Sequence, residues 1–531
     1  MRKRKFTKLA TIIVMGLLVT VTSCKKDLTP KGAITAANVY TDFSNYQQIL
    51  GKLYTAYAIS GQQGGSGNPD IAFLDEGFSN YLREYFNMQE LTTDEAQIVW
   101  NDGTVHNLHD MTWNNQNEFI RAMYDRIYYE ISLDNEFIRN TTDATLSKNG
   151  ITGSNLTLAK QYRAEARFLR ALSYWHAIDL FGSVPLVTEA DNVAVFFPAQ
   201  KSRTDIYNYI ESELKAVDGD LGAPRFSYGH ADKAAAYTLL AKLYLNAKVY
   251  TGTDHSTDAI TYANKVITSG YTLEQHFKNL FLADNNKSNE IIFPIESDGL
   301  HTQGYGGMTY LVHASVGGNM APKDYGINGG WSGLRVTKQY VALFSDPSGA
   351  TDKRAMFFTD GQTLNMADEY TFNDGYAITK FKNVTSTGVA GSDPAGNFVD
   401  TDFPMFRLAD VYLIYAEAVL RGGSGGDLGT ALGYVNAVRT RAYDGVATGN
   451  ITSAQLTLPF ILDERGRELL FEGHRRTDLI RFGQFSGSTY LWQWKGGVLN
   501  GTSVSADLNI MPIPSTQMAL NPSLKQNPGY N

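Results

Sequence analysis

The chain has 531 residues, of which 19% are charged and 43% hydrophobic, and its formal net charge is −8. An acidic chain without a basic stripe argues against nucleic acid as a partner, because polyanion binding needs clustered Lys and Arg. Cys24 is the only cysteine, so no internal disulfide can form. The fold must therefore be held together by its core.

The N-terminus has the organisation of a secretory signal. Five Lys and Arg lie within residues 1–8, an uncharged apolar run covers residues 9–21, and Cys24 follows the small-residue sequence VTS. The run is too short for a reliable membrane-spanning helix. A lone cysteine here is typical of a bacterial lipobox, so we expect residues 1–23 to be a lipoprotein signal peptide and the Cys24 thiol to be acylated. Cleavage reduces the 46 Lys and Arg to 41 against 54 Asp and Glu, a net charge of −13.

Residues 24–531 contain no long Pro-rich or charge-rich linker, so we expect one body. The segment KAAAYTLLAKLYLNAKVY has the spacing of the first helix of a tetratricopeptide repeat, with Ala241 at the small position, and STDAITYANKVITSG supplies a second helix. RLADVYLIYAEAVLR with TALGYVNAVRTRAY, and QYRAEARFLRALSYWHAIDLFG with TDIYNYIESELKAV, repeat the pairing less regularly. A plain helix hairpin explains any single pair equally well. Together the pairs predict a right-handed stack.

The composition changes at about residue 290, where the N-terminal part with its helix pairs ends. Up to about residue 400 the chain is rich in Gly, Tyr and Asn, apolar runs are short, and turns such as NGG and NDG recur. This pattern predicts a long irregular insertion with a few short strands, followed by closing helix pairs. Long irregular segments in a compact body are usually functional.

The segment ERGRELLFEGHRRTDLIRFG concentrates nine charged residues in twenty, and all five of its cations are arginine. Arginine presents a planar fork that pairs two carboxylate oxygens at once. We therefore predict a buried structural ion-pair network here rather than an acid–base site, since such networks are common among neighbouring carboxylates and guanidiniums. Its predicted members are Arg465, Glu468, Glu472, Arg475 and Arg476.

Catalytic and metal-binding interpretations have weaker support. Asp94 and Glu95 are a possible glycosidase pair, but adjacent side chains usually point in different directions. His106 and His109, with Asp110, could bind a metal, yet no third histidine is near and no HExxH spacing is present. No Walker or dinucleotide glycine motif occurs. We expect a chain that is not an enzyme, with no cofactor, no metal and a hydrogen-bonded structural role for the two histidines.

Five phrases resemble the SusD/RagB family of surface lipoproteins: ELTTDEAQIVW, GYAITKF, FPMFRLADVYLIYAEAVLR, ERGRELLFEGHRRTDLIRFG and MPIPSTQMALNPSLKQNPGY, spread over the mature chain in the family's order. The resemblance implies a mainly α fold with tetratricopeptide-like helix pairs, a SusD-like α-superhelix. It also implies an outer-membrane lipid anchor at Cys24, facing the cell exterior, and a TonB-dependent (SusC-like) transporter as partner.

The implied function is non-catalytic capture of a nutrient glycan or oligosaccharide and its delivery to that transporter. Capture of peptides, as in the RagB branch, is an alternative within the family. A surface glycoside hydrolase is an alternative from another class, and a lid without its own ligand is a fourth hypothesis.

A glycan site needs flat aromatic rings with polar groups at their edges. Trp100 precedes two polar residues at a turn, Trp331 lies in a glycine-rich turn, and both resemble places where loops of the family carry ligand-binding aromatics. In the alternative interpretation, each residue only packs its loop onto the helices. The residues predicted to bind the ligand are Trp331, Trp100, Asn101, Asp102, Tyr305, Tyr310, Asn328 and Arg335.

Overall fold

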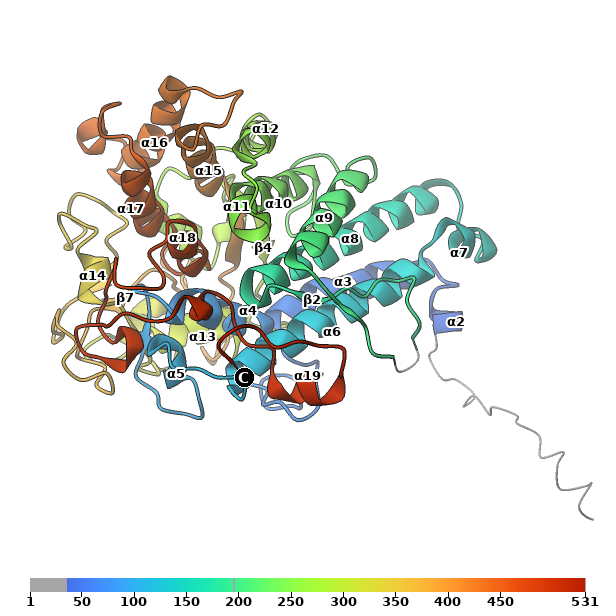
Figure 1. Cartoon of the computed structure of the whole chain (residues 1–531), viewed down its shortest axis with the longest axis horizontal. Coiled ribbons are helices and arrows are strands. Elements are labelled where there is room, and N and C mark those ends of the chain that lie inside the picture. Colours follow the sequence, from blue (N-terminus) through green and yellow to red (C-terminus); the bar gives the residue numbers. More distant parts are fainter. Residues whose placement is uncertain (1–35, 194–195, 531) are drawn as a thin grey trace, which may run out of the picture.

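A computed structural model describes residues 36–193 and 196–530, and the signal segment and Cys24 lie outside the described residues. Helices dominate the structure, and they pack side by side across the molecule (Figure 1). Among the described helices, none is both long and apolar enough to cross a bilayer.

The α-helices are α2 (Ala36–Val39), α3 (Ser44–Ala58), α4 (Tyr81–Phe86), α5 (His106–His109), α6 (Glu118–Asn140), α7 (Asp143–Lys148), α8 (Gly153–Phe181), α9 (Arg203–Ala216), α10 (Lys233–Leu245), α11 (Ala247–Thr251), α12 (Ser256–Ile267), α13 (Gly307–Ala314), α14 (Lys338–Val341), α15 (Leu408–Leu420), α16 (Leu428–Ala442), α17 (Leu458–Leu469), α18 (Arg475–Arg481) and α19 (Ser515–Leu520). Shorter helical turns are η1 (Asn87–Leu91), η2 (Phe277–Phe281), η3 (Asn285–Lys287), η4 (Pro322–Tyr325), η5 (Ala447–Gly449), η6 (Lys495–Gly497) and η7 (Ala506–Asn509).

The helices form a continuous stack in which each packs on its neighbours. The order of contact runs from α6 through α8, α9, α10 and α12 to α15, and α15 packs against both α16 and α17. Ala241 and Ala263 are fully buried where α10 meets α12. The three predicted helix pairs are α8–α9, α10–α12 and α15–α16, so the predicted mainly α fold with paired helices is confirmed.

The chain leaves this stack after α12 and returns to it at α15, and these two helices pack together across the gap in sequence. The short strands are β1 (Gln97–Ile98), β2 (Val184–Pro185), β3 (Gln200–Lys201), β4 (Ile291–Ile295), β5 (Leu334–Arg335), β6 (Phe357–Phe358), β7 (Ala377–Ile378) and β8 (Phe403–Arg407). They pair antiparallel as β4–β8, β1–β5, β6–β7 and β2–β3. The β4–β8 pair closes the insertion at its base.

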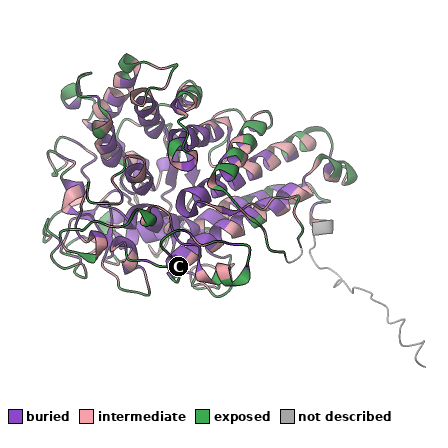
Figure 2. Cartoon of the chain, in the orientation of Figure 1, coloured by how far each residue is buried: buried purple, intermediate pink, exposed green. Residues whose placement is uncertain are grey.

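The insertion also contains α13, all of whose residues are buried. From the sequence we expected only loops and strands there. The segment GMTYLVHA is buried on every side, and a short, mostly apolar run of this kind does not distinguish a helix from a strand. Buried residues lie where the helices pack against one another and beneath the loops (Figure 2). One core cluster extends from Tyr40 to Tyr530 and includes Trp113 and Trp175.

The charged segment forms α17, a turn and α18, and its carboxylates lie in the core. Glu468 is fully buried and accepts hydrogen bonds from Arg407 at 2.7 Å, from Arg354 at 3.3 Å and from Arg441. Burial raises the pKa of the Glu468 carboxyl, but these guanidiniums outweigh it and hold the pKa below its usual value. Glu472 pairs with Lys380 at 2.6 Å and with Arg407 at 2.5 Å.

The cations of the segment are paired in the same way. Each of the three predicted arginines contacts a buried carboxylate from a different part of the chain, so the network joins the C-terminal helices to the N-terminal ones. The pairs are Arg465 with Asp410 at 2.8 Å and with Asp478 at 2.7 Å, Arg475 with Asp94 at 2.8 Å, and Arg476 with Asp179 at 3.3 Å.

Candidate glycan-binding site

The β1–β5 ribbon brings the two predicted tryptophans together. Ile98 pairs with Leu334, Trp100 follows β1 and Trp331 precedes β5, so in an antiparallel ribbon both emerge at the same end. The Trp100 indole Nε1 donates a hydrogen bond to the Trp331 carbonyl oxygen at 3.1 Å. Their ring centroids are 6.4 Å apart, with the planes inclined by 44°.

Two further rings extend this pair. Tyr305 lies 6.2 Å from Trp331 with the planes at 59°, and Phe398 lies 5.4 Å from Tyr305 at 37°. All four residues are half-buried, so part of each is open to solvent. We call Trp100, Trp331, Tyr305 and Phe398 the aromatic surface. Phe398 was not predicted, because it lies in a polar loop that carries no periodic pattern.

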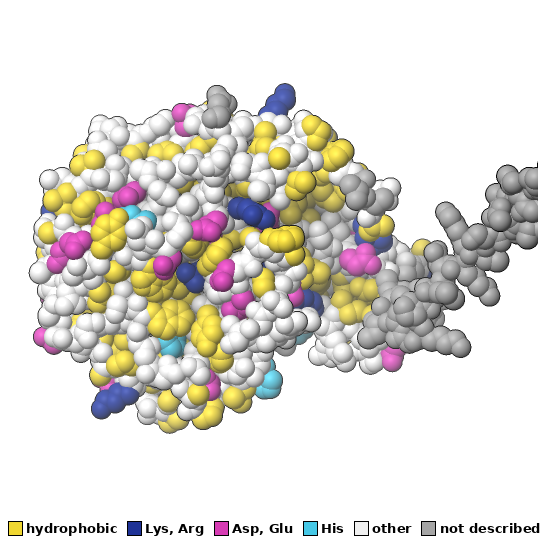
Figure 3. Space-filling view, turned by 90° about the horizontal axis from the view of Figure 1, so that it is seen from below, with side chains coloured by type: hydrophobic (Ala, Val, Ile, Leu, Met, Phe, Trp, Pro, Cys, Tyr) yellow, Lys and Arg dark blue, Asp and Glu magenta, His cyan; other side chains and the backbone are white. Residues whose placement is uncertain are grey.

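Hydrophobic side chains gather near the middle of the lower face of the molecule (Figure 3), the side on which α5 and α13 lie in Figure 1. Exposed apolar groups rimmed by polar ones commonly mark a binding surface.

Residues packed directly against Trp100 and Trp331 hold these two rings in place. A Cβ at Gly333 would lie 2.8 Å from Cζ2 of Trp100, so only glycine leaves that ring its position. His313 stacks beneath Trp331 with centroids 4.7 Å apart and planes at 26°. The His313 Nδ1 lies 2.7 Å from the Gly329 carbonyl oxygen, which fixes the imidazole in turn. A ring held this rigidly loses little entropy when a ligand stacks on it.

Two residues predicted to bind the ligand are buried instead. Tyr310 is fully buried, because it belongs to the helix α13, and the Arg83 guanidinium lies 4.2 Å above its ring. That guanidinium is also 5.9 Å from the Trp100 ring, and its Nε is buried without a hydrogen-bond partner among the described residues. Direct ligand contact by Tyr310 is therefore a wrong prediction. Arg83, which we did not predict, is a half-buried cation beside the aromatic surface.

Arg335 is the second correction. Its side chain is fully buried in β5 and its guanidinium is occupied by backbone, so it supports a loop of the insertion and is not available to a ligand. The carbonyl oxygens that it binds are those of Thr371 at 2.8 Å, Asp374 at 2.6 Å and Glu369 at 2.6 Å.

The remaining predicted residues lie at the surface. Asn101 and Asp102 follow Trp100 and are exposed. Asn328 is exposed and donates a hydrogen bond to the Asn397 Oδ1 at 2.6 Å. These amides and the carboxylate supply polar groups near the rings, as a sugar hydroxyl requires.

The possible catalytic pair belongs to the buried network. Asp94 and Glu95 are buried, and Asp94 accepts two hydrogen bonds from Arg475 and one from the Tyr490 hydroxyl at 2.6 Å. Glu95 accepts from the Phe471 amide at 3.1 Å. Both carboxylates are thus structural.

A cleft of about 770 Å³ is lined by residues other than those of the aromatic surface. Its walls include Tyr228, His230, Glu296 and Asp402. Burial raises the pKa of Asp402 to about 7. The cleft has acidic walls and a pair of neighbouring rings in its described lining, Tyr54 and His230, with centroids 5.9 Å apart, whereas the aromatic surface carries four rings in succession.

The chain is similar to proteins that bind glycans. Residues 353–530 match the model of the SusD family, and residues 72–245 match a model described as "Starch-binding associating with outer membrane". The starch-binding protein SusD of Bacteroides thetaiotaomicron is 36% identical over 560 aligned residues, which cover 96% of either chain.

Solved structures share the fold. The surface glycan-binding protein A of Bacteroides fluxus superposes with a TM-score of 0.70 at 21% identity, over 92% of this chain and 99% of the other. A laminarin-binding SusD-like protein gives a TM-score of 0.67 at 22% identity, again over 92% and 99%. On the family match and the full-length identity together, this chain belongs to the SusD family.

Proposed function

We propose that the chain is a non-catalytic glycan-binding lipoprotein that captures its ligand on the aromatic surface. The observation that carries the proposal is the row of four half-buried rings, from Trp100 through Trp331 and Tyr305 to Phe398, with exposed polar side chains nearby. Sugar rings have apolar C–H faces that stack on such planes and hydroxyls that bind polar rims.

We propose a starch-type glucan as the ligand class. The successive planes are inclined by 44° and 59°, so the surface curves and suits a coiled α-linked glucan better than a flat ribbon. The starch-binding relative covers 96% of this chain, which supports the same choice.

Family membership supports the finer parts of the proposal. We propose that the Cys24 lipid anchors the chain to the outer membrane with the protein facing the cell exterior. A TonB-dependent, SusC-like transporter would receive the bound oligosaccharide from it. Co-purification of such a transporter with the lipidated chain from membranes is the expected result, and loss of its membrane attachment in C24A would test the anchor.

The ligand is tested by affinity electrophoresis through gels containing amylopectin, laminarin or no polysaccharide. We expect amylopectin to retard the chain, and Trp331→Ala and Trp100→Ala to migrate freely. Phe197→Ala is the matched control, because Phe197 is 58% exposed and lies outside the aromatic surface. Retardation by laminarin alone would overturn the starch assignment, and the absence of retardation by any glycan would favour peptide cargo. New reducing ends during incubation would contradict the non-catalytic role.

A further inference from the structure

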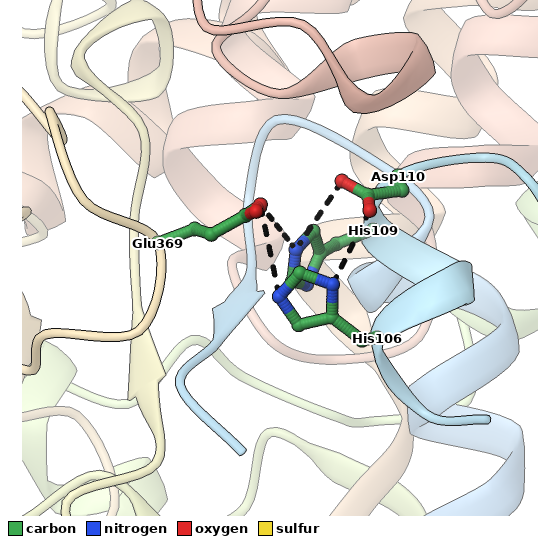
Figure 4. A group of neighbouring side chains, drawn as sticks. All are labelled: His106, His109, Asp110 and Glu369. Atoms are coloured by element: carbon green, nitrogen blue, oxygen red, sulfur yellow. Dashed lines mark hydrogen bonds and ion pairs between the residues drawn. The ribbon is translucent and has the colours of Figure 1, made fainter. Parts of the chain in front are cut away.

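Four potential metal-binding side chains converge beside the β1–β5 ribbon. His106, His109 and Asp110 come from α5 and its end, and Glu369 reaches them from a loop of the insertion (Figure 4). One donor atom from each residue can be chosen so that all four lie within 4.8 Å of one another. Only the first three were evident from the sequence, because the fourth is far away in the chain.

Three of the separations between donor atoms are close to those around a tetrahedral metal. His109 Nε2 lies 3.3 Å from the Glu369 Oε2 and 3.5 Å from the Asp110 Oδ1, and His106 Nε2 lies 3.6 Å from the Glu369 Oε2. Zinc binds nitrogen and oxygen ligands at about 2.0–2.1 Å, which sets neighbouring donors about 3.3–3.5 Å apart in a tetrahedron. Three donor pairs thus already have nearly the spacing that a zinc ion requires, and all four donor atoms lie within 4.8 Å of one another.

Two of these donors have no hydrogen-bond partner among the residues that the structure describes. His106 is 6% exposed, and its buried Nε2 faces Glu369 without such a bond. The Asp110 Oδ1 is likewise buried and unbonded within the described chain. Buried polar atoms are normally hydrogen-bonded, and a bound ion often satisfies those that are not. These two unpaired donors are a second reason, besides the spacing, to assign a metal here.

Neighbouring residues orient His106 for metal binding, but one contact disfavours metal binding by His109. His106 Nδ1 lies 3.2 Å from the Asp110 Oδ2, and the ring stacks on Tyr370 at 4.6 Å with the planes at 7°, so Nε2 is left to bind a metal. The Ile98 amide points at His109 Nδ1 from 3.4 Å. Metal binding through His109 Nε2 places the ring proton on Nδ1 and breaks this long contact. The metal would still bind favourably, because it satisfies several buried donor atoms while only this one weak hydrogen bond is lost.

We propose that His106, His109, Asp110 and Glu369 form a binding site for a zinc-class divalent metal that fastens the insertion loop to α5. The site is structural, because all four coordination positions are filled by protein. Arg335 in β5 binds the Glu369 carbonyl oxygen, so the metal also braces the ribbon that carries the two tryptophans through this strand. This inference does not depend on which glycan is bound.

The test uses the purified chain without a polyhistidine tag, stripped by a chelator and then titrated with Zn²⁺ and, separately, Co²⁺. We expect one tightly bound zinc per chain, a higher melting temperature on zinc addition, and visible ligand-field bands of tetrahedral cobalt. His106→Ala and Glu369→Gln should lose the bound metal and the thermal shift.

The matched control is His301→Ala, which removes an exposed histidine 2.8 Å from the Asp298 carboxylate. It should leave the zinc stoichiometry and the thermal shift unchanged. The zinc stoichiometry and cobalt spectrum of the unmutated chain test the site even if a variant misfolds. An unmutated chain that binds no zinc after stripping, or that gives only octahedral cobalt spectra, would overturn the site. Equal zinc binding by Glu369→Gln would also overturn it.

Discussion

The pair of Arg475 with Asp94 provides a quantitative test of the buried network. Arg475 donates two hydrogen bonds of 2.8 Å to Asp94, and both side chains are essentially inaccessible to solvent. In Arg475→Met the carboxylate keeps only the Tyr490 hydroxyl as a side-chain partner among the described residues. Leaving a buried charge uncompensated costs about 3–5 kcal/mol, which agrees with the loss of two charge-assisted hydrogen bonds at about 1.5–3 kcal/mol each.

The assay is urea unfolding followed by circular dichroism, with the free energy of unfolding extrapolated to water. The double variant Asp94→Asn/Arg475→Met should be more stable than Arg475→Met alone, because it removes the orphaned charge. Lys215→Met is the matched control: Lys215 pairs with Glu211 at 2.7 Å but is 49% exposed, and such pairs contribute about 0.3–0.5 kcal/mol. A cost below about 1 kcal/mol for Arg475→Met, or a double variant no more stable than the single one, would refute the reasoning.

Gly333→Ala places a Cβ 2.8 Å from the Trp100 ring, so it should weaken glycan binding in a titration while the chain stays folded. In the control Gly433→Ala in α16, the new Cβ has no described atom within 4 Å, and the variant should gain about 0.5–1 kcal/mol of stability. Unchanged glycan binding in Gly333→Ala would contradict the role of Gly333 behind the Trp100 ring. Burial, which is the larger cause, and the neighbouring Asp134 carboxylate raise the pKa of Glu130 well above its usual value. The folded state thus holds a proton that the unfolded state releases, so stability is full below the unfolded pKa of about 4.3 and falls as the pH rises through the folded pKa. Glu130→Gln should reduce this loss of stability, measured as the difference in unfolding free energy between about pH 5 and pH 8. An unchanged difference in the variant would contradict the role of Glu130.

The helix pairs and the charged core were predictable because their signals are local. Small residues such as Ala241 recur at helical spacing, and the arginines around Leu469 and Phe471 interrupt an apolar stretch that has to be buried. Side chains of this kind can be buried only in pairs. The partners themselves were not predictable, since Asp94 and Asp179 lie hundreds of residues away from Arg475 and Arg476.

The site was predictable only in part because its assembly is non-local. Trp100 and Trp331 meet through two-residue strands, which are too short to leave an alternating pattern. Arg335 looked like an available cation, but its two terminal nitrogens donate to the backbone of a later loop. Glu369 completes the histidine cluster only after that loop has folded back over α5.

The most direct test of the central claim is calorimetric titration of the purified chain with a linear starch oligosaccharide, alongside Trp331→Ala. We predict saturable binding by the unmutated chain and a loss of at least about 2 kcal/mol, or about 30-fold in Kd, in the variant, the usual cost of removing a central tryptophan. The variant should unfold at nearly the same urea concentration as the unmutated chain. Equal affinity in the two proteins, or no binding of any starch oligosaccharide by the unmutated chain, would contradict the account.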